Sequence, residues 1–116
     1  MMNNAKFTVQ NGLCAINGNE VFFPYSVTRV QEASNIFVIM VEPPAGVIFN
    51  RNIFGCDSNG EILWQIQESP HGWGDNKSYF EIFQDGSGGV VATRIGINYQ
   101  VNINDGSVAP KSFNRF

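Results

Sequence analysis

Residues that build most catalytic and metal sites are scarce in this 116-residue sequence, which has one histidine, His71, and two cysteines, Cys14 and Cys56. Any Ser-His-Asp or Cys-His arrangement would have to use His71. The three residues also form none of the spacings that are typical of structural zinc sites. The sequence therefore predicts a protein that is not an enzyme, with no catalytic residue, no metal site and no cofactor.

Charge is low as well, at 15% of the residues, against about 25% in an average globular chain. Seven Lys and Arg residues against ten Asp and Glu residues give a net charge of −3. A chain without a basic surplus releases few counterions from a phosphate backbone, so nucleic acid is not an expected partner. The apolar content of 43% is enough for one packed core, which excludes intrinsic disorder.

Long apolar runs are missing. The longest, residues 36–41, is far shorter than the roughly 20 residues that span a bilayer. Residues 1–6 lack the apolar segment of a signal peptide. We therefore expect no membrane span, no signal peptide and a cytoplasmic location, in which Cys14 and Cys56 are buried free thiols rather than a disulfide.

Turn-forming residues are abundant, with fourteen Asn and twelve Gly that tolerate a positive φ angle. Asn-Gly and Asp-Gly pairs favour the two-residue turns of β-hairpins. Five such pairs occur, at residues 11–12, 17–18, 59–60, 85–86 and 105–106. The sequence therefore predicts an all-β protein built of antiparallel meanders.

Runs of Val, Ile, Phe and Tyr between these turns predict about eleven short strands in a single domain of residues 1–116. The one helix signal is a capping box at residues 28–31. The predicted strands are residues 6–10, 13–17, 20–30 with a break at Pro24, 36–42, 46–50, 53–57, 61–67, 79–84, 89–95, 98–103 and 107–113.

Two of these strands have informative side-chain patterns. Residues 36–41 have no polar position, as expected of a central strand that is covered on both faces. Residues 98–103 alternate between amide and apolar side chains, which predicts one buried face made of Tyr99, Val101 and Ile103.

The sequence also repeats itself. Residues 36–51 align without a gap on residues 79–94, at an offset of 43. Residues 13–21 resemble residues 54–62, and after a short adjustment Phe54 aligns with Tyr99. The alignments predict one recurring turn with periods of 42 and 46, and blade-like repeats that contain three, four and four strands. That turn contains Gly18, Gly60 and Gly106.

Residues 52–66, Asn-Ile-Phe-Gly-Cys-Asp-Ser-Asn-Gly-Glu-Ile-Leu-Trp-Gln-Ile, resemble the inner hairpin of quinoprotein-type β-propeller blades. Residues 97–113 are similar, with Asn102 in the place of the Asp. The resemblance implies that the Asp side chain caps the turn and that the Trp covers the blade. Two and three-quarter blades cannot close a ring of four to eight, so no quinone site or dehydrogenase activity follows. We expect a sandwich or an incomplete propeller, as a monomer in preference to a homodimer.

Four polar residues at turns are assigned structural roles. Glu42 and Asp85 stand next to turn residues, where acids usually cap the backbone. Arg51 and Arg94 match in the alignment at offset 43, which predicts a shared task of bonding turn carbonyls or acids.

The longest unpatterned segment, residues 67–78, contains the candidate binding residues His71, Trp73 and Asp75, and Tyr79 follows it. Loops often carry function, and an exposed Trp is typical of an interface hot spot. The structural alternative is that Trp73 folds back onto the core while His71 is solvated.

These features predict a non-enzymatic protein-binding module that acts by stoichiometric binding. The chain as a whole resembles small bacterial proteins found beside toxin genes, and this resemblance implies a toxin partner and an immunity role. The alternative is a domain that holds an apolar small molecule between its sheets, lined by some of its ten Phe residues.

Overall fold

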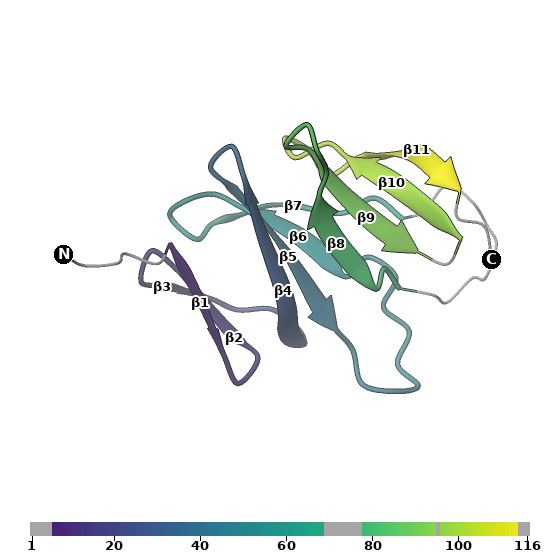
Figure 1. The fold of residues 1–116 in the computed structure, drawn as a ribbon. Helices are drawn as coiled ribbons and strands as arrows, with labels where there is room; N and C mark the ends of the chain where they lie inside the picture. The colour runs from purple at the N-terminus through teal and green to yellow at the C-terminus, as the bar shows by residue number, and fades with distance from the viewer. Residues whose placement is uncertain (1–5, 69–77, 95, 114–116) are drawn as a thin grey trace.

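A computed structural model describes residues 6–68, 78–94 and 96–113, and every regular element in these ranges is a β-strand (Figure 1). No helix of the length and hydropathy needed to cross a bilayer occurs in these three ranges. The strands are β1 (Phe7–Gln10), β2 (Leu13–Ile16), β3 (Asn19–Val21), β4 (Ser26–Ala33), β5 (Ile36–Glu42), β6 (Ile53–Cys56), β7 (Ile62–Gln65), β8 (Glu81–Gln84), β9 (Val90–Arg94), β10 (Ile97–Val101) and β11 (Val108–Phe113).

The strands form three antiparallel meanders, in which each strand pairs with its neighbours in the sequence. Sheet A contains β1 to β3, sheet B contains β4 to β7, and sheet C contains β8 to β11. Figure 1 shows sheet B between sheets A and C. The structure confirms the predicted all-β class and the division into three, four and four strands.

The capping-box signal at residues 28–31 starts no helix, because these residues lie inside β4, which pairs with β5. The predicted strand at residues 46–50 was wrong, since those residues form no strand. Sheet B instead takes its fourth strand from β4, which ends in a tight turn at Ser34 and Asn35. Both turn residues have positive φ, 49° and 66°, so the turn has the left-handed geometry of an Asn-Gly hairpin without a glycine.

Sheet B is the central layer of the molecule. One core lies between sheets A and B and contains Phe37, Ile39 and Val41 of β5. The other lies between sheets B and C and contains Val38 and Met40 of the same strand. Successive side chains of a strand point to opposite faces, so β5 is covered on both sides, as its uninterrupted apolar sequence predicted.

The recurring turn is confirmed by the topology. Gly18, Gly60 and Gly106 each lie between the last two strands of their sheets and have φ angles of 84°, 85° and 80°. The alignment at offset 43 is wrong, because it sets β5, the second strand of sheet B, against β8, the first strand of sheet C. Apolar content made these two strands look equivalent. When the three sheets are aligned on these glycines, the three strands of sheet A match the second, third and fourth strands of sheets B and C.

Trp64 joins sheets B and C. Its indole ring lies against Gly55 on the neighbouring strand β6 and against Gly106 in the β10–β11 turn. The indole N–H donates a hydrogen bond to the carbonyl oxygen of Ile103, at 2.7 Å. The ring is buried and belongs to the core between the two sheets. The ring therefore covers β6 of sheet B, in line with the predicted covering role, and it also donates a hydrogen bond to the β10–β11 turn of sheet C.

Candidate protein-binding surface

The predicted binding residues are divided between two parts of the chain. His71, Trp73 and Asp75 lie outside the described residues and stay predictions. Tyr79 is described and is only 2% exposed, with its ring packed edge-on against Tyr99 at a centroid distance of 6.0 Å. Its hydroxyl donates to the carbonyl oxygen of Gln67, at 3.1 Å. The Tyr79 ring is therefore part of the core and is not presented to a partner.

The environment of the Tyr79 hydroxyl also keeps it in its protonated form at neutral pH. Burial is the main cause that raises the pKa of Tyr79 well above its usual value near 10, and the neighbouring Tyr99 raises it further. The hydroxyl therefore stays protonated and acts as a hydrogen-bond donor.

Asn52 holds Tyr79 in place. Its side-chain amide nitrogen donates to the carbonyl oxygens of Val41, at 2.9 Å, and Tyr79, at 2.8 Å. Its amide oxygen accepts the backbone N–H of Tyr79, at 3.0 Å. Asn52 is 1% exposed, so each of these bonds satisfies a group that has left water. One side chain thus connects β5, the start of β6 and the segment that enters β8.

Because Asn52 turns Tyr79 inward, the next side chain points outward. Phe80 is 57% exposed, and its backbone N–H donates to the carbonyl oxygen of Thr93, at 3.0 Å. The alternation of an extended chain explains the pair, with Tyr79 in the core and Phe80 on the surface. Sequence analysis selected Tyr79 and missed Phe80, since the pattern does not indicate which of two adjacent aromatic residues faces the core.

The loop between β5 and β6, residues 43–52, supplies a second set of exposed apolar side chains. It projects beyond the ends of the strands at the lower edge of Figure 1. Together with residues 78–80 it lines a groove of about 310 Å³. We name four exposed apolar residues of this groove the apolar patch: Pro44, Ala45, Val47 and Phe80.

The geometry of the loop has a clear origin in its sequence. The paired prolines Pro43 and Pro44 offer no backbone N–H, so the ladder of β5 ends before them. The N–H of Val47 donates to the carbonyl oxygen of Pro44, at 3.0 Å, and Gly46 between them has a φ of 84°. Further along, the ring of Phe49 packs against Tyr25, at 5.2 Å, and fixes the loop to the core between sheets A and B. The Pro-Pro pair and the glycine were the signals against a strand here.

The carboxylates at the hairpin turns are structural. The Asp57 carboxylate accepts the N–H groups of Asn59 and Glu61, at 2.9 and 3.0 Å. In the equivalent turn of sheet C, the side-chain oxygen of Asn102 accepts the N–H of Asn104, at 2.9 Å. These contacts confirm that the acid of the recurring motif caps its turn, and that Asn performs the same task.

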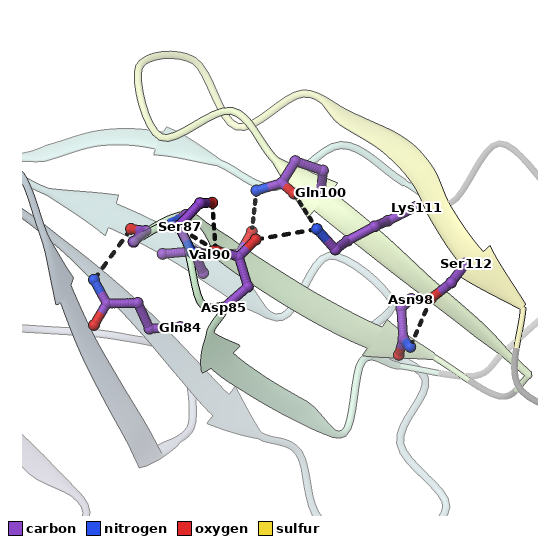
Figure 2. Close-up of polar contacts among 10 residues, drawn as sticks. Gln84, Asp85, Ser87, Val90, Asn98, Gln100, Lys111 and Ser112 are labelled. Atoms are coloured by element: carbon purple, nitrogen blue, oxygen red, sulfur yellow. Dashed lines mark hydrogen bonds and ion pairs between the residues drawn. The ribbon is translucent and has the colours of Figure 1, made fainter.

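Asp85 is the most heavily bonded of these carboxylates. One oxygen accepts the hydroxyl and the N–H of Ser87, at 2.7 and 2.9 Å, and the N–H of Gly89, at 3.0 Å. The other oxygen forms an ion pair with Lys111, at 3.1 Å, which also donates to Gln100 (Figure 2). The predicted capping role of Asp85 is confirmed.

These bonds predict a dependence of stability on pH. The Ser87 hydroxyl and the Lys111 ammonium are the largest causes that hold the pKa of Asp85 well below its usual value. A lowered pKa in the folded state stabilises the protein above the unfolded-state pKa, about 3.9, and this stabilisation is lost as the pH falls below that value. Urea unfolding should show that Asp85→Asn is less stable than the wild type at pH 7, with the difference shrinking at pH 2.5. A difference that is constant across this range would contradict the assignment.

The two arginines do not occupy equivalent positions, because the alignment that paired them was wrong. Arg51 precedes β6, and its guanidinium donates to the carbonyl oxygens of Ile66, at 2.8 Å, and Gln65, at 3.3 Å. Arg94 ends β9 and is buried. Arg51 therefore bonds carbonyls, as predicted, but these lie at the end of β7 rather than in a turn.

Cys14 and Cys56 are free thiols buried in the core between sheets A and B. Burial raises the pKa of both thiols, to about 12 for Cys56, where Cys14 and Asp57 add smaller contributions. A thiol with such a pKa is almost entirely protonated at neutral pH and is a poor nucleophile. Within the described ranges, no three His, Cys, Asp or Glu side chains lie close enough together to hold a metal ion.

Comparison with protein families adds one finding. A family model described as "Domain of unknown function (DUF7957)" matches residues 2–113, which is almost the whole chain. The chain belongs to the DUF7957 family. The match extends over all three sheets, so the family corresponds to the complete fold described above. Searches of curated proteins and of solved structures found no match.

Proposed function

We propose that this protein is a non-enzymatic protein-binding module that acts as a monomer by stoichiometric binding through the apolar patch. Neutralisation of a toxin is the specific role that we propose. The exposure of Phe80 beside the β5–β6 loop is the observation that carries the proposal. Contiguous exposed apolar side chains in a folded protein are typical of interaction sites.

The rigidity of the patch supports this proposal. Phe80 follows the anchored Tyr79, and the loop is fixed at one side by Phe49 and at its end by Asn52. A surface that is already ordered loses little conformational entropy when a partner binds. Aromatic anchors of this kind dominate the binding free energy of many interfaces.

The surroundings of the reactive side chains support a role without catalysis. Asp57 and Asp85 are occupied in capping turns, and burial keeps Cys14 and Cys56 protonated. The alternative of an enclosed apolar ligand has no comparable support. Aromatic side chains fill the core between sheets B and C, namely Trp64, Tyr79 and Tyr99.

The test is a binding measurement on a purified pair. A tagged copy of the protein should retain a protein partner, and light scattering should report a one-to-one complex. Phe80→Ser should raise Kd more than about fivefold, which corresponds to a loss of about 1 kcal/mol. If the partner is a toxin, co-expression of the wild-type protein should protect cells from it.

Phe22→Ser is the matched control. Phe22 is 76% exposed and follows β3 in sheet A, outside the apolar patch, so its loss removes an even more exposed phenyl ring from another place. This variant should leave Kd unchanged. A complex that is equally stable with Phe80→Ser and with the wild type would exclude the patch as the binding surface.

A further inference from the structure

A second groove, of about 610 Å³, is lined in part by Pro43, Pro44 and Ala45. The rings of Pro24 and Tyr25 and the carboxylate-bearing residue Glu42 also line it. Residues 42–45 line the groove of the apolar patch as well, so the two grooves adjoin along this segment. The inference drawn from this groove rests on the proposed function, because it concerns the same partner.

The walls of the groove are held by the fold. Tyr25 packs edge-on against Phe49, with ring centroids 5.2 Å apart and an interplanar angle of 66°. Glu42 is the last residue of β5 and pairs with Ser26 at the end of the β4–β5 ladder. An aromatic ring, proline rings and a carboxylate are therefore presented together on a rigid support.

The charge of Glu42 is not balanced by the described part of the chain. No ion pair or hydrogen bond joins its side chain to another described residue, so the predicted capping role of Glu42 was wrong. The described cations have partners elsewhere. Lys6 pairs with Glu32, Arg29 with Glu81 and Lys111 with Asp85, and Arg51 donates to the backbone carbonyls of Gln65 and Ile66. Arg94 is also engaged. The groove thus adds a negative charge to a surface of a protein whose net charge is already −3.

We propose that this groove binds an arginine or lysine side chain of the protein partner. Such a side chain has an apolar stem that packs on apolar surface while its charged end stays polar. The stem fits the proline rings, a cation over the Tyr25 ring gains cation–π attraction, and the charged end pairs with Glu42. A planar guanidinium both stacks on rings and binds a carboxylate through two hydrogen bonds, so arginine is the better fit.

The proposal can be tested without the partner. N-acetylarginine methylamide is the probe, and N-acetylcitrulline methylamide, which has the same shape and no charge, is the matched control compound. Titration of the ¹⁵N-labelled protein should shift the amide signals of Tyr25, Ser26 and Glu42, with a Kd on the order of a few millimolar. The citrulline compound should cause much smaller shifts at the same concentrations.

Two variants separate the groove from a general effect of charge. Glu42→Gln should weaken binding of the arginine probe at least about fivefold. Glu20→Gln removes an exposed carboxylate of β3, in sheet A, and should leave the titration unchanged. Spectra of the free variants show whether each one is folded. Equal shifts from the two compounds, shifts elsewhere on the protein, or an unaffected Glu42→Gln titration would overturn the proposal.

The outcome is independent of the test of the proposed function. Phe80→Ser leaves the groove intact, so this variant should still bind the arginine probe while its complex with the protein partner is weakened. A probe that fails to bind, together with a complex that needs Phe80, would reject the cation groove and retain the apolar patch.

Discussion

Gly55→Ala should lower the free energy of unfolding by about 3 kcal/mol, near the upper end of the range for overpacking a core. A methyl group on Gly55 would overlap the indole ring of Trp64, which lies against it across the β6–β7 pair. The ring cannot move away easily, because Gly106 contacts its other part and Ile103 accepts its N–H. Thermal unfolding should show a decrease in Tm of roughly 15 °C for a chain of this length.

Two further variants test this explanation. Gly86→Ala is the matched control, since a methyl group there meets no atom within 4 Å and the residue has no positive φ; it should leave Tm nearly unchanged. In a Trp64→Leu background, Gly55→Ala should cost much less, because the overlapping ring is gone. If Gly55→Ala were equally harmful in both backgrounds, a cause other than contact with Trp64 would be required.

Asn52→Ala should lower the free energy of unfolding by about 4 kcal/mol, since each buried group left without its partner costs about 1–3 kcal/mol. The substitution removes three hydrogen bonds to the backbone of Val41 and Tyr79, all of them buried. Urea unfolding measures the loss. Amide hydrogen exchange should also show faster exchange of the Tyr79 N–H, because its acceptor is absent.

Asn19→Ala is the control for this prediction, since Asn19 is an exposed residue of β3, and its change should cost little. The variant also bears on the proposed function. Asn52 orients Tyr79 and thereby Phe80, so Asn52→Ala should weaken binding through the apolar patch. Unchanged exchange at Tyr79 would contradict the anchoring role of Asn52.

The turns were predictable because their chemistry is local. A positive φ is a property of one or two residues, and the Asn-Gly pairs with Gly18 and Gly60 were read correctly as hairpins. The cap at Asp57 depends on groups within four residues, so it could also be predicted. The turn at Ser34 and Asn35 was missed, because these residues adopt positive φ without the glycine that usually signals it.

The candidate site was less accessible to sequence analysis. Phe80 is exposed because Asn52, 27 residues away from Tyr79, bonds to the backbone of that residue and turns its ring inward. The groove at Glu42 exists because Tyr25 and the Pro43–Pro44 pair meet at the end of the β4–β5 ladder. No short window of sequence contains both partners of either arrangement.

The amino-acid sequence by itself determined the all-β class, the hairpin turns, the burial of β5 on both faces and the turn shared by the three sheets. These features follow from residue patterns with short periods and from the φ preferences of Gly and Asn. Only the tertiary structure decided which strands complete sheet B, which aromatic residue of the Tyr79–Phe80 pair faces outward, and how Trp64 joins two sheets. Each of these depends on packing between segments distant in the chain, where many pairings of similar apolar runs are compatible with the same local pattern.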